Sequence, residues 1–128
     1  MELNQKAAEE TVNQIIKEGG KAKSYACDIS NQAKVIETFQ EIDKVDILVN
    51  NAGYGLNGSF VDLPIIDQLN MMQLNMNSLV QLCHVFIPIL KKAEKSYILN
   101  VSSTTAYQAI PYMSLYAASK SFVLSFSR

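Results

Sequence analysis

Residues 46–53 of this 128-residue chain read DILVNNAG, an apolar triplet that runs directly into a turn of small and amide-bearing residues. The triplet Ile47–Val49 is typical of a short strand buried in a parallel sheet. The turn from Asn50 to Gly53 lets backbone approach a ligand closely, because alanine and glycine have little or no side chain. This stretch therefore predicts a strand that ends at a ligand-binding edge.

Strands and helices are expected to alternate on both sides of this stretch. The other expected strands are Lys23–Cys27 and Ile98–Val101. Helical patterns cover residues 4–18, 64–92 and 113–128, and the helix over 64–92 is expected to bend near Asn75 or Pro88. A further helix is expected after the cap candidates Asp28 and Ser30. Its inward-facing residues are Val35, Ile36, Phe39 and Ile42. Such alternation predicts an α/β fold with a parallel sheet covered on both faces.

Composition and charge narrow the class of protein. The formal net charge is −1 and 48% of the residues are hydrophobic, which favours one soluble globular domain over residues 1–128 and gives no sign of a nucleic-acid partner. No apolar run is long enough for a membrane span. Cys27 and Cys83 lack a metal-binding or redox spacing, and His84 is the only histidine, so we expect no metal site. Two reduced, buried thiols are typical of a cytoplasmic protein.

Tyr116 and Lys120 are four residues apart in the last predicted helix. Side chains at this spacing lie on one face of a helix, so the ammonium can lie near the phenol. A nearby positive charge favours the phenolate and lowers the pKa of a tyrosine, which is otherwise about 10. The spacing also occurs by chance, and a surface or core role for both residues is the alternative interpretation.

Polar residues follow each predicted strand. Asp28, Asn50–Gly53 and Ser103 are expected at one rim of the sheet, outside the carboxyl ends of the strands. Together with the Tyr116–Lys120 pair, these motifs resemble the short-chain dehydrogenase/reductase family. The resemblance implies a Rossmann-like doubly wound parallel sheet. It also implies one incomplete dinucleotide-binding domain truncated at both ends, because no Gly-rich turn joins a first strand to a first helix.

The resemblance implies four catalytic residues. Tyr116 would be the general acid/base, and Lys120 would lower the tyrosine pKa and bind the nicotinamide ribose. Ser103 would hold the substrate oxygen, with Ser102 as the alternative. Asn75 would bind a water that links Lys120 to solvent, with Asn77 as the alternative.

The implied cofactor is NAD or NADP. Asp28 and Ile29 would contact the adenine, although Asp28 is also a candidate helix cap. The whole set of implied cofactor-binding residues is Asp28, Ile29, Asn51, Ala52, Gly53, Tyr116 and Lys120. The choice between the two cofactors depends on residues after a strand that the chain lacks.

The implied function is that of a NAD(P)-dependent oxidoreductase that interconverts an alcohol and a carbonyl by hydride transfer. The expected partners are a small-molecule substrate and further copies of the chain, paired as a homodimer or homotetramer through the long helix and the Tyr116 helix. One alternative is a non-catalytic truncated fragment or binding module of the same fold. Epimerisation or dehydration with the same Tyr and Lys is another.

Overall fold

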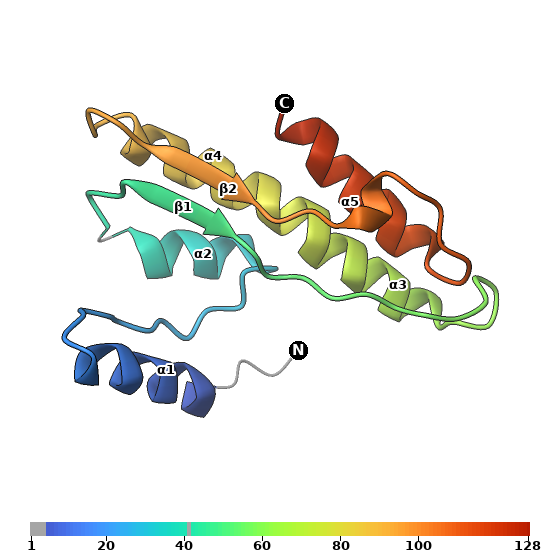
Figure 1. Cartoon of the computed structure of the whole chain (residues 1–128), viewed down its shortest axis with the longest axis horizontal. Coiled ribbons are helices and arrows are strands. Elements are labelled where there is room, and N and C mark those ends of the chain that lie inside the picture. Colours follow the sequence, from blue (N-terminus) through green and yellow to red (C-terminus); the bar gives the residue numbers. More distant parts are fainter. Residues whose placement is uncertain (1–4, 41) are drawn as a thin grey trace.

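Two parallel strands lie side by side at the centre of the chain (Figure 1). The computed structural model describes residues 5–40 and 42–128. Strand β1 (Ile47–Asn50) pairs with β2 (Tyr97–Asn100) in a register that places Ile47 opposite Tyr97 and Asn50 opposite Asn100. The two predicted strands that precede the Asn50 turn and Ser102 are therefore neighbours, and both end at the same edge of the sheet.

Helices connect and flank these strands. The first two are α1 (Gln5–Lys17) and α2 (Gln32–Phe39), and the last is α5 (Ser114–Phe126). Between β1 and β2 the chain forms α3 (Ile65–Met72), a π-helical turn η1 (Gln73–Ser78) and α4 (Leu79–Leu90). A short 3₁₀ turn η2 (Thr104–Ala106) precedes α5. No helix in the described ranges is both long and apolar enough to cross a bilayer.

The run from α3 to α4 confirms the prediction of one long helix that is interrupted near Asn75. The interruption is a π-helical turn, in which the backbone widens by one residue. Ser78 donates a hydrogen bond from Oγ to the carbonyl of Gln73, 3.1 Å away, so its side chain also bridges this turn. Turns of this kind are frequent at functional sites. Pro88 lies inside α4 near its end.

The core lies where α4 and α5 meet β1. Leu79, Cys83 and Val123 form a buried cluster, and Leu48 and Phe122 pack against it. Alternate residues of a strand point to opposite faces, so this cluster covers the Leu48 face of β1. On the other face, Ile47 and Val49 are 59% and 53% exposed. The expected burial of this strand on both faces is therefore wrong for the described part of the chain.

The segment 23–27 was expected to be a strand, and this prediction is wrong. The segment is extended but makes no strand pairing, and in Figure 1 it runs apart from both arrows. Its Tyr25 ring lies 5.7 Å from the ring of Phe39 in α2, and of its five residues only Cys27 is buried. A strand needs a hydrogen-bonded neighbour, and none is provided by the residues that the structure describes.

Helix α1 ends where the sequence predicts. Gly19 has a φ of +86°, a left-handed conformation that glycine adopts without steric cost, and its N–H bonds the carbonyl of Ile16. The expected start at Asn4 lies outside the described residues. No residue of α1 is buried, so its apolar side is not packed into the core as the pattern suggested.

Candidate active site

Tyr116 and Lys120 lie on one face of α5, as their spacing predicts. The Lys120 Nζ atom is 5.8 Å from the centre of the Tyr116 ring. Lys120 is buried, with 6% of its surface exposed, and its Nζ donates a 2.9 Å hydrogen bond to the carbonyl of Val101. Burial lowers the pKa of the Lys120 ammonium. The helix thus holds a partly desolvated cation next to an aromatic ring that is only half-buried.

The two serines after β2 have different contacts. Ser102 donates a 2.8 Å hydrogen bond from Oγ to the backbone carbonyl of Lys120 and so fastens the end of β2 to α5. Ser103 accepts a 3.2 Å bond at Oγ from the N–H of Thr105, which caps η2. Because this bond uses a lone pair, the Ser103 hydroxyl hydrogen remains able to bind a substrate oxygen. Ser103 therefore fills the cap role, while its substrate-binding role stays a prediction.

Asn75 is buried in η1, and its side chain makes two hydrogen bonds to the backbone of Tyr54. Its Oδ1 accepts from the Tyr54 N–H at 3.1 Å, and its Nδ2 donates to the Tyr54 carbonyl at 2.8 Å. The second Nδ2 hydrogen bonds Ser119 Oγ at 3.1 Å. Asn77 is exposed and bonds only within its own helix, to Gln73. Of the two candidate asparagines, only Asn75 connects to the Tyr116 helix.

Two glycines allow the loop after β1 to approach these residues. A Cβ atom added to Gly53 would lie 2.8 Å from Asn75 Oδ1 and 3.8 Å from Lys120 Nζ. A Cβ atom added to Gly55 would lie 3.1 Å from Cδ2 of the Tyr116 ring. The backbone of this loop therefore lies against both the cation and the phenol ring.

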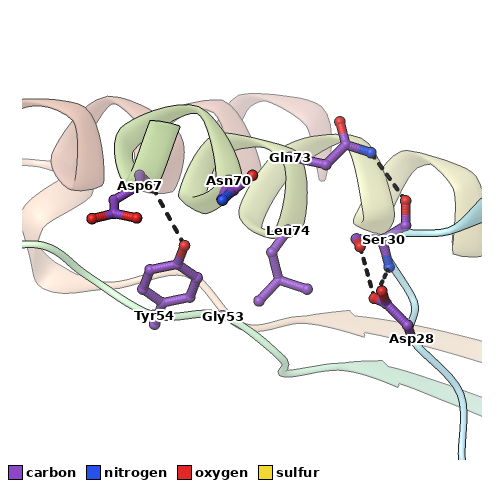
Figure 2. A pocket seen from close by; sticks show the side chains of 8 residues that line it. All are labelled: Asp28, Ser30, Gly53, Tyr54, Asp67, Asn70, Gln73 and Leu74. Atoms are coloured by element: carbon purple, nitrogen blue, oxygen red, sulfur yellow. Dashed lines mark hydrogen bonds between the residues drawn. The ribbon is translucent and has the colours of Figure 1, made fainter. Parts of the chain in front are cut away.

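A cleft of about 660 Å³ lies beside Gly53, and Figure 2 shows the side chains that line it. Asp28 lies at one end of it and Tyr54 at the other, with Leu74 between them. This volume is in the range of small-molecule and cofactor sites. Ser103, Tyr116 and Lys120 are not among the residues that line the cleft. Gly53 lines it and also lies close to Lys120, since a Cβ atom added to Gly53 would be 3.8 Å from Nζ.

Asp28 is not the helix cap. Its Oδ1 accepts bonds from both the N–H and the hydroxyl of Ser30, at 2.9 and 2.7 Å, and these bonds lower the pKa of the Asp28 carboxyl. Asn31 caps α2 instead by accepting from Lys34 N–H. Helix α2 starts too late for Asp28 to reach its free N–H groups, so the carboxylate closes a turn and faces the cleft.

Three more of the predicted cofactor residues line a neighbouring cavity. Ile29, Asn51 and Ala52 surround a space of about 330 Å³ together with residues of β1, α2 and α4. Leu74 lines this cavity and the larger cleft. Five of the seven predicted cofactor residues thus lie around two adjoining spaces, whereas Tyr116 and Lys120 line neither.

Asn50 ties the ends of the strands together, as proposed for the turn. Its Nδ2 donates to Oδ1 of Asn100 at 2.8 Å, and Asn100 in turn donates to Ser127 at the end of α5. This side-chain bond extends the pairing of β1 and β2 at the edge where Gly53 and Ser103 emerge.

Sequence reasoning missed Ser119. The residue is fully buried and bonds both Asn75 and the carbonyl of Tyr116. A signal was present, because a serine inside a helix carries a propensity cost and this one falls between Tyr116 and Lys120. The structure also places Gly55 against the Tyr116 ring, a contact that could not be predicted from the sequence.

The chain matches the family model described as short chain dehydrogenase over residues 1–128, and it belongs to that family. It is 32% identical over 113 residues to a 3-ketodihydrosphingosine reductase of Bacteroides thetaiotaomicron, covering 84% of this chain and 42% of the relative. It is 33% identical over 123 residues to a 7alpha-hydroxysteroid dehydrogenase of Escherichia coli K12, covering 93% of this chain and 48% of the relative.

Solved structures agree with this assignment. A short chain dehydrogenase/reductase from Burkholderia phymatum in complex with NAD superposes with a TM-score of 0.87 at 28% identity, over 97% of this chain and 46% of that structure. A NAD+-bound xylitol dehydrogenase gives a TM-score of 0.88 at 26% identity, over 97% and 50%. The Rossmann-like fold predicted from the sequence is confirmed. The chain spans about half the length of these relatives.

Proposed function

We propose that this chain carries the proton-transfer site of a NAD(P)-dependent oxidoreductase that interconverts an alcohol and a carbonyl. The observation that supports this most directly is the burial of Lys120 one helical turn from Tyr116, with Nζ 5.8 Å from the ring centre. Burying an ammonium costs free energy, so such a residue is a candidate for function when it faces a titratable partner. Relatives named as reductases and dehydrogenases support the same reaction class.

In this proposal Tyr116 passes a proton to or from the substrate oxygen. Lys120 lies one helical turn away, where its ammonium would stabilise the negative charge that develops on the phenol oxygen during the transfer. Ser103 donates its free hydroxyl hydrogen to the same substrate oxygen. The bond from Ser102 to the Lys120 carbonyl keeps the Ser103 backbone beside α5.

The role proposed for Asn75 is narrower than a general water site. Its two Nδ2 hydrogens and one Oδ1 lone pair are already used by Tyr54 and Ser119. The side chain can therefore offer a relay water only the second lone pair of Oδ1. Its main contribution is to hold the loop at Gly53 and Tyr54 against Lys120.

The residues around the cleft fit the adenosine end of NAD or NADP. A carboxylate at Asp28, which can accept from an amino group, and the bare backbone of Gly53 line one space of about 660 Å³. Ile29, Asn51 and Ala52 line the adjoining cavity. Lys120 lies beyond Gly53 and would bind the ribose next to the nicotinamide. When bound, such a cofactor supplies or accepts the hydride.

Cofactor binding with turnover tests this function. The complete protein would be titrated with NADH and with NADPH, following the quenching of its tyrosine fluorescence, and then assayed with a panel of ketones and secondary alcohols. The proposal predicts saturable binding of one or both cofactors and a change in absorbance at the nicotinamide band that depends on substrate. Absence of both would refute it.

A non-catalytic binding module is the second candidate, and the share of the relatives that the chain spans favours considering it. Saturable cofactor binding without any substrate-dependent turnover would support this candidate.

Association through the long helix and α5 remains part of the proposal. Ile87 and Phe126 are exposed there, whereas Phe86 and Leu90 are buried and belong to the core. Two free, buried thiols agree with a cytoplasmic location.

A further inference from the structure

We propose that Ser119 is a positioning residue, which holds Asn75 and the Tyr116–Lys120 helix in one fixed arrangement. This inference rests on the proposed function, because it concerns the geometry of the proton-transfer site. It adds a residue between Tyr116 and Lys120 that does not itself touch the substrate.

The contacts of Ser119 leave its hydroxyl no freedom. The side chain is fully buried, its Oγ donates to the Tyr116 carbonyl at 2.7 Å, and it accepts from Asn75 Nδ2 at 3.1 Å. A hydroxyl has one hydrogen, so the bond to the Tyr116 carbonyl commits it. The hydroxyl can therefore only accept from Asn75, which fixes the side of the amide that faces α5.

The orientation of Asn75 matters because its other contacts are also one-directional. Oδ1 must accept from the Tyr54 N–H, and Nδ2 must donate to the Tyr54 carbonyl. If the amide were flipped, Nδ2 would face the Tyr54 N–H, and Oδ1 would face both the Tyr54 carbonyl and Ser119 Oγ. None of these three contacts could then be a hydrogen bond. Ser119 and Tyr54 thus specify the same amide orientation from two different elements.

The bonded chain from Tyr54 through Asn75 and Ser119 to Tyr116 connects three segments: the loop after β1, η1 and α5. Gly53 directly precedes Tyr54, and a Cβ atom added to it would lie 3.8 Å from Lys120 Nζ. A shift of Asn75 would therefore move the backbone that lines both the cleft and the cation. We infer that loss of Ser119 disturbs the surroundings of Lys120 and the placement of Tyr116 beside it.

Ser121 provides a matched control. It is also on α5, and its Oγ donates a 3.0 Å hydrogen bond to the carbonyl of Ala106 in η2. Its removal takes away one hydroxyl and one inter-element bond from the same helix without affecting Asn75. A purely structural role of Ser119 would therefore give Ser119→Ala and Ser121→Ala the same phenotype.

The experiment compares Ser119→Ala, Ser121→Ala and Tyr116→Phe in the complete protein. Alcohol oxidation would be followed across pH, and thermal unfolding would be recorded for each variant. A displacement of about 1 Å can reduce turnover 100-fold, so we expect Ser119→Ala to lower kcat by about tenfold to 100-fold and to shift the pH at which kcat is half-maximal. Ser121→Ala should stay within about twofold of the parent, with an unchanged pH profile.

The outcomes separate the two proposals. If Tyr116→Phe is inactive and Ser119→Ala has the kcat and pH profile of Ser121→Ala, the positioning role is refuted while the proposed function stands. If Tyr116→Phe keeps full activity, the proposed function fails. Should Ser119→Ala not fold, Ser119→Cys retains the shape with a weaker donor and acceptor. A lowered kcat with a shifted profile in that variant supports the role, and a parental kcat and profile refute it.

Discussion

Gly55 lies directly against the ring of Tyr116. A methyl group on its Cα would come within 3.1 Å of Cδ2 and 3.2 Å of Cγ, which is too close without movement of the ring or the loop. The loop after β1 therefore packs against the Tyr116 ring at Gly55 and limits where the phenol can lie. This contact joins two parts of the chain that the sequence separates by 61 positions.

Gly55→Ala should displace the Tyr116 ring by a few tenths of an ångström. We expect kcat to fall by about threefold to 30-fold, because proton transfer depends steeply on position, while cofactor affinity changes little. Gly58→Ala is the control, since its added Cβ would press on the end of the Leu63 side chain instead. Equal kcat values for the two variants would contradict the claim that the contact of Gly55 sets the position of the Tyr116 ring.

Asn75→Ala should destabilise the chain strongly. It would leave the N–H and the carbonyl of Tyr54 without their side-chain partner, at a cost of about 2–4 kcal/mol in the free energy of unfolding. Asn77→Ala removes one exposed bond within a helix and should cost about 0.5 kcal/mol or less. Urea unfolding of both variants measures the difference, and similar midpoints would contradict the assignment of Asn75 over Asn77.

Ser30→Ala should raise the pKa of Asp28. The side-chain hydroxyl and the N–H of Ser30 stabilise the carboxylate, so the folded pKa is below the unfolded value of about 3.9. The resulting stabilisation is fully present above that unfolded value and is lost as the pH falls through the lower folded value. A carboxyl NMR titration would show a smaller depression in the variant. An unchanged Asp28 pKa would mean that the hydroxyl contributes nothing.

Lys120 should make stability depend on alkaline pH. Burial lowers its folded pKa, so the unfolded chain binds more protons between that pKa and the ordinary value of about 10.4. The free energy of unfolding should therefore rise with pH across this interval. Lys120→Met should lack this contribution, which urea unfolding at a series of pH values would isolate as a difference. If the difference in free energy of unfolding between the parent and Lys120→Met stays constant or falls as the pH rises, burial does not lower the pKa of Lys120.

Local features of the site could be predicted from the sequence. The apolar triplet at Ile47–Val49 and its turn are set by neighbouring residues, and so is the helix that brings Tyr116 and Lys120 to one face. The strand ends meet at one edge because parallel strands share their direction. These elements were expected and are observed.

Features that depend on distant partners could not be predicted. The segment 23–27 has strand-like composition, but pairing is non-local, and its ring contact is that of Tyr25 with Phe39 in α2. The choice of Asn31 over Asp28 as a cap depended on where the helix began, at Gln32, four positions after Asp28. The link from Asn75 to Tyr54 and Ser119 crosses 21 and 44 positions of the chain and has no local pattern.

The most direct test of the account is turnover by Tyr116→Phe in the complete protein, measured beside Tyr107→Phe. Tyr107 is 73% exposed and serves as a tyrosine outside the site. Loss of a positioned general acid/base typically reduces the rate by about 10²–10⁴-fold, and we expect this reduction only at Tyr116, with thermal stability kept in both variants. Near-parental turnover by a folded Tyr116→Phe variant would contradict the proton-transfer role on which the account depends.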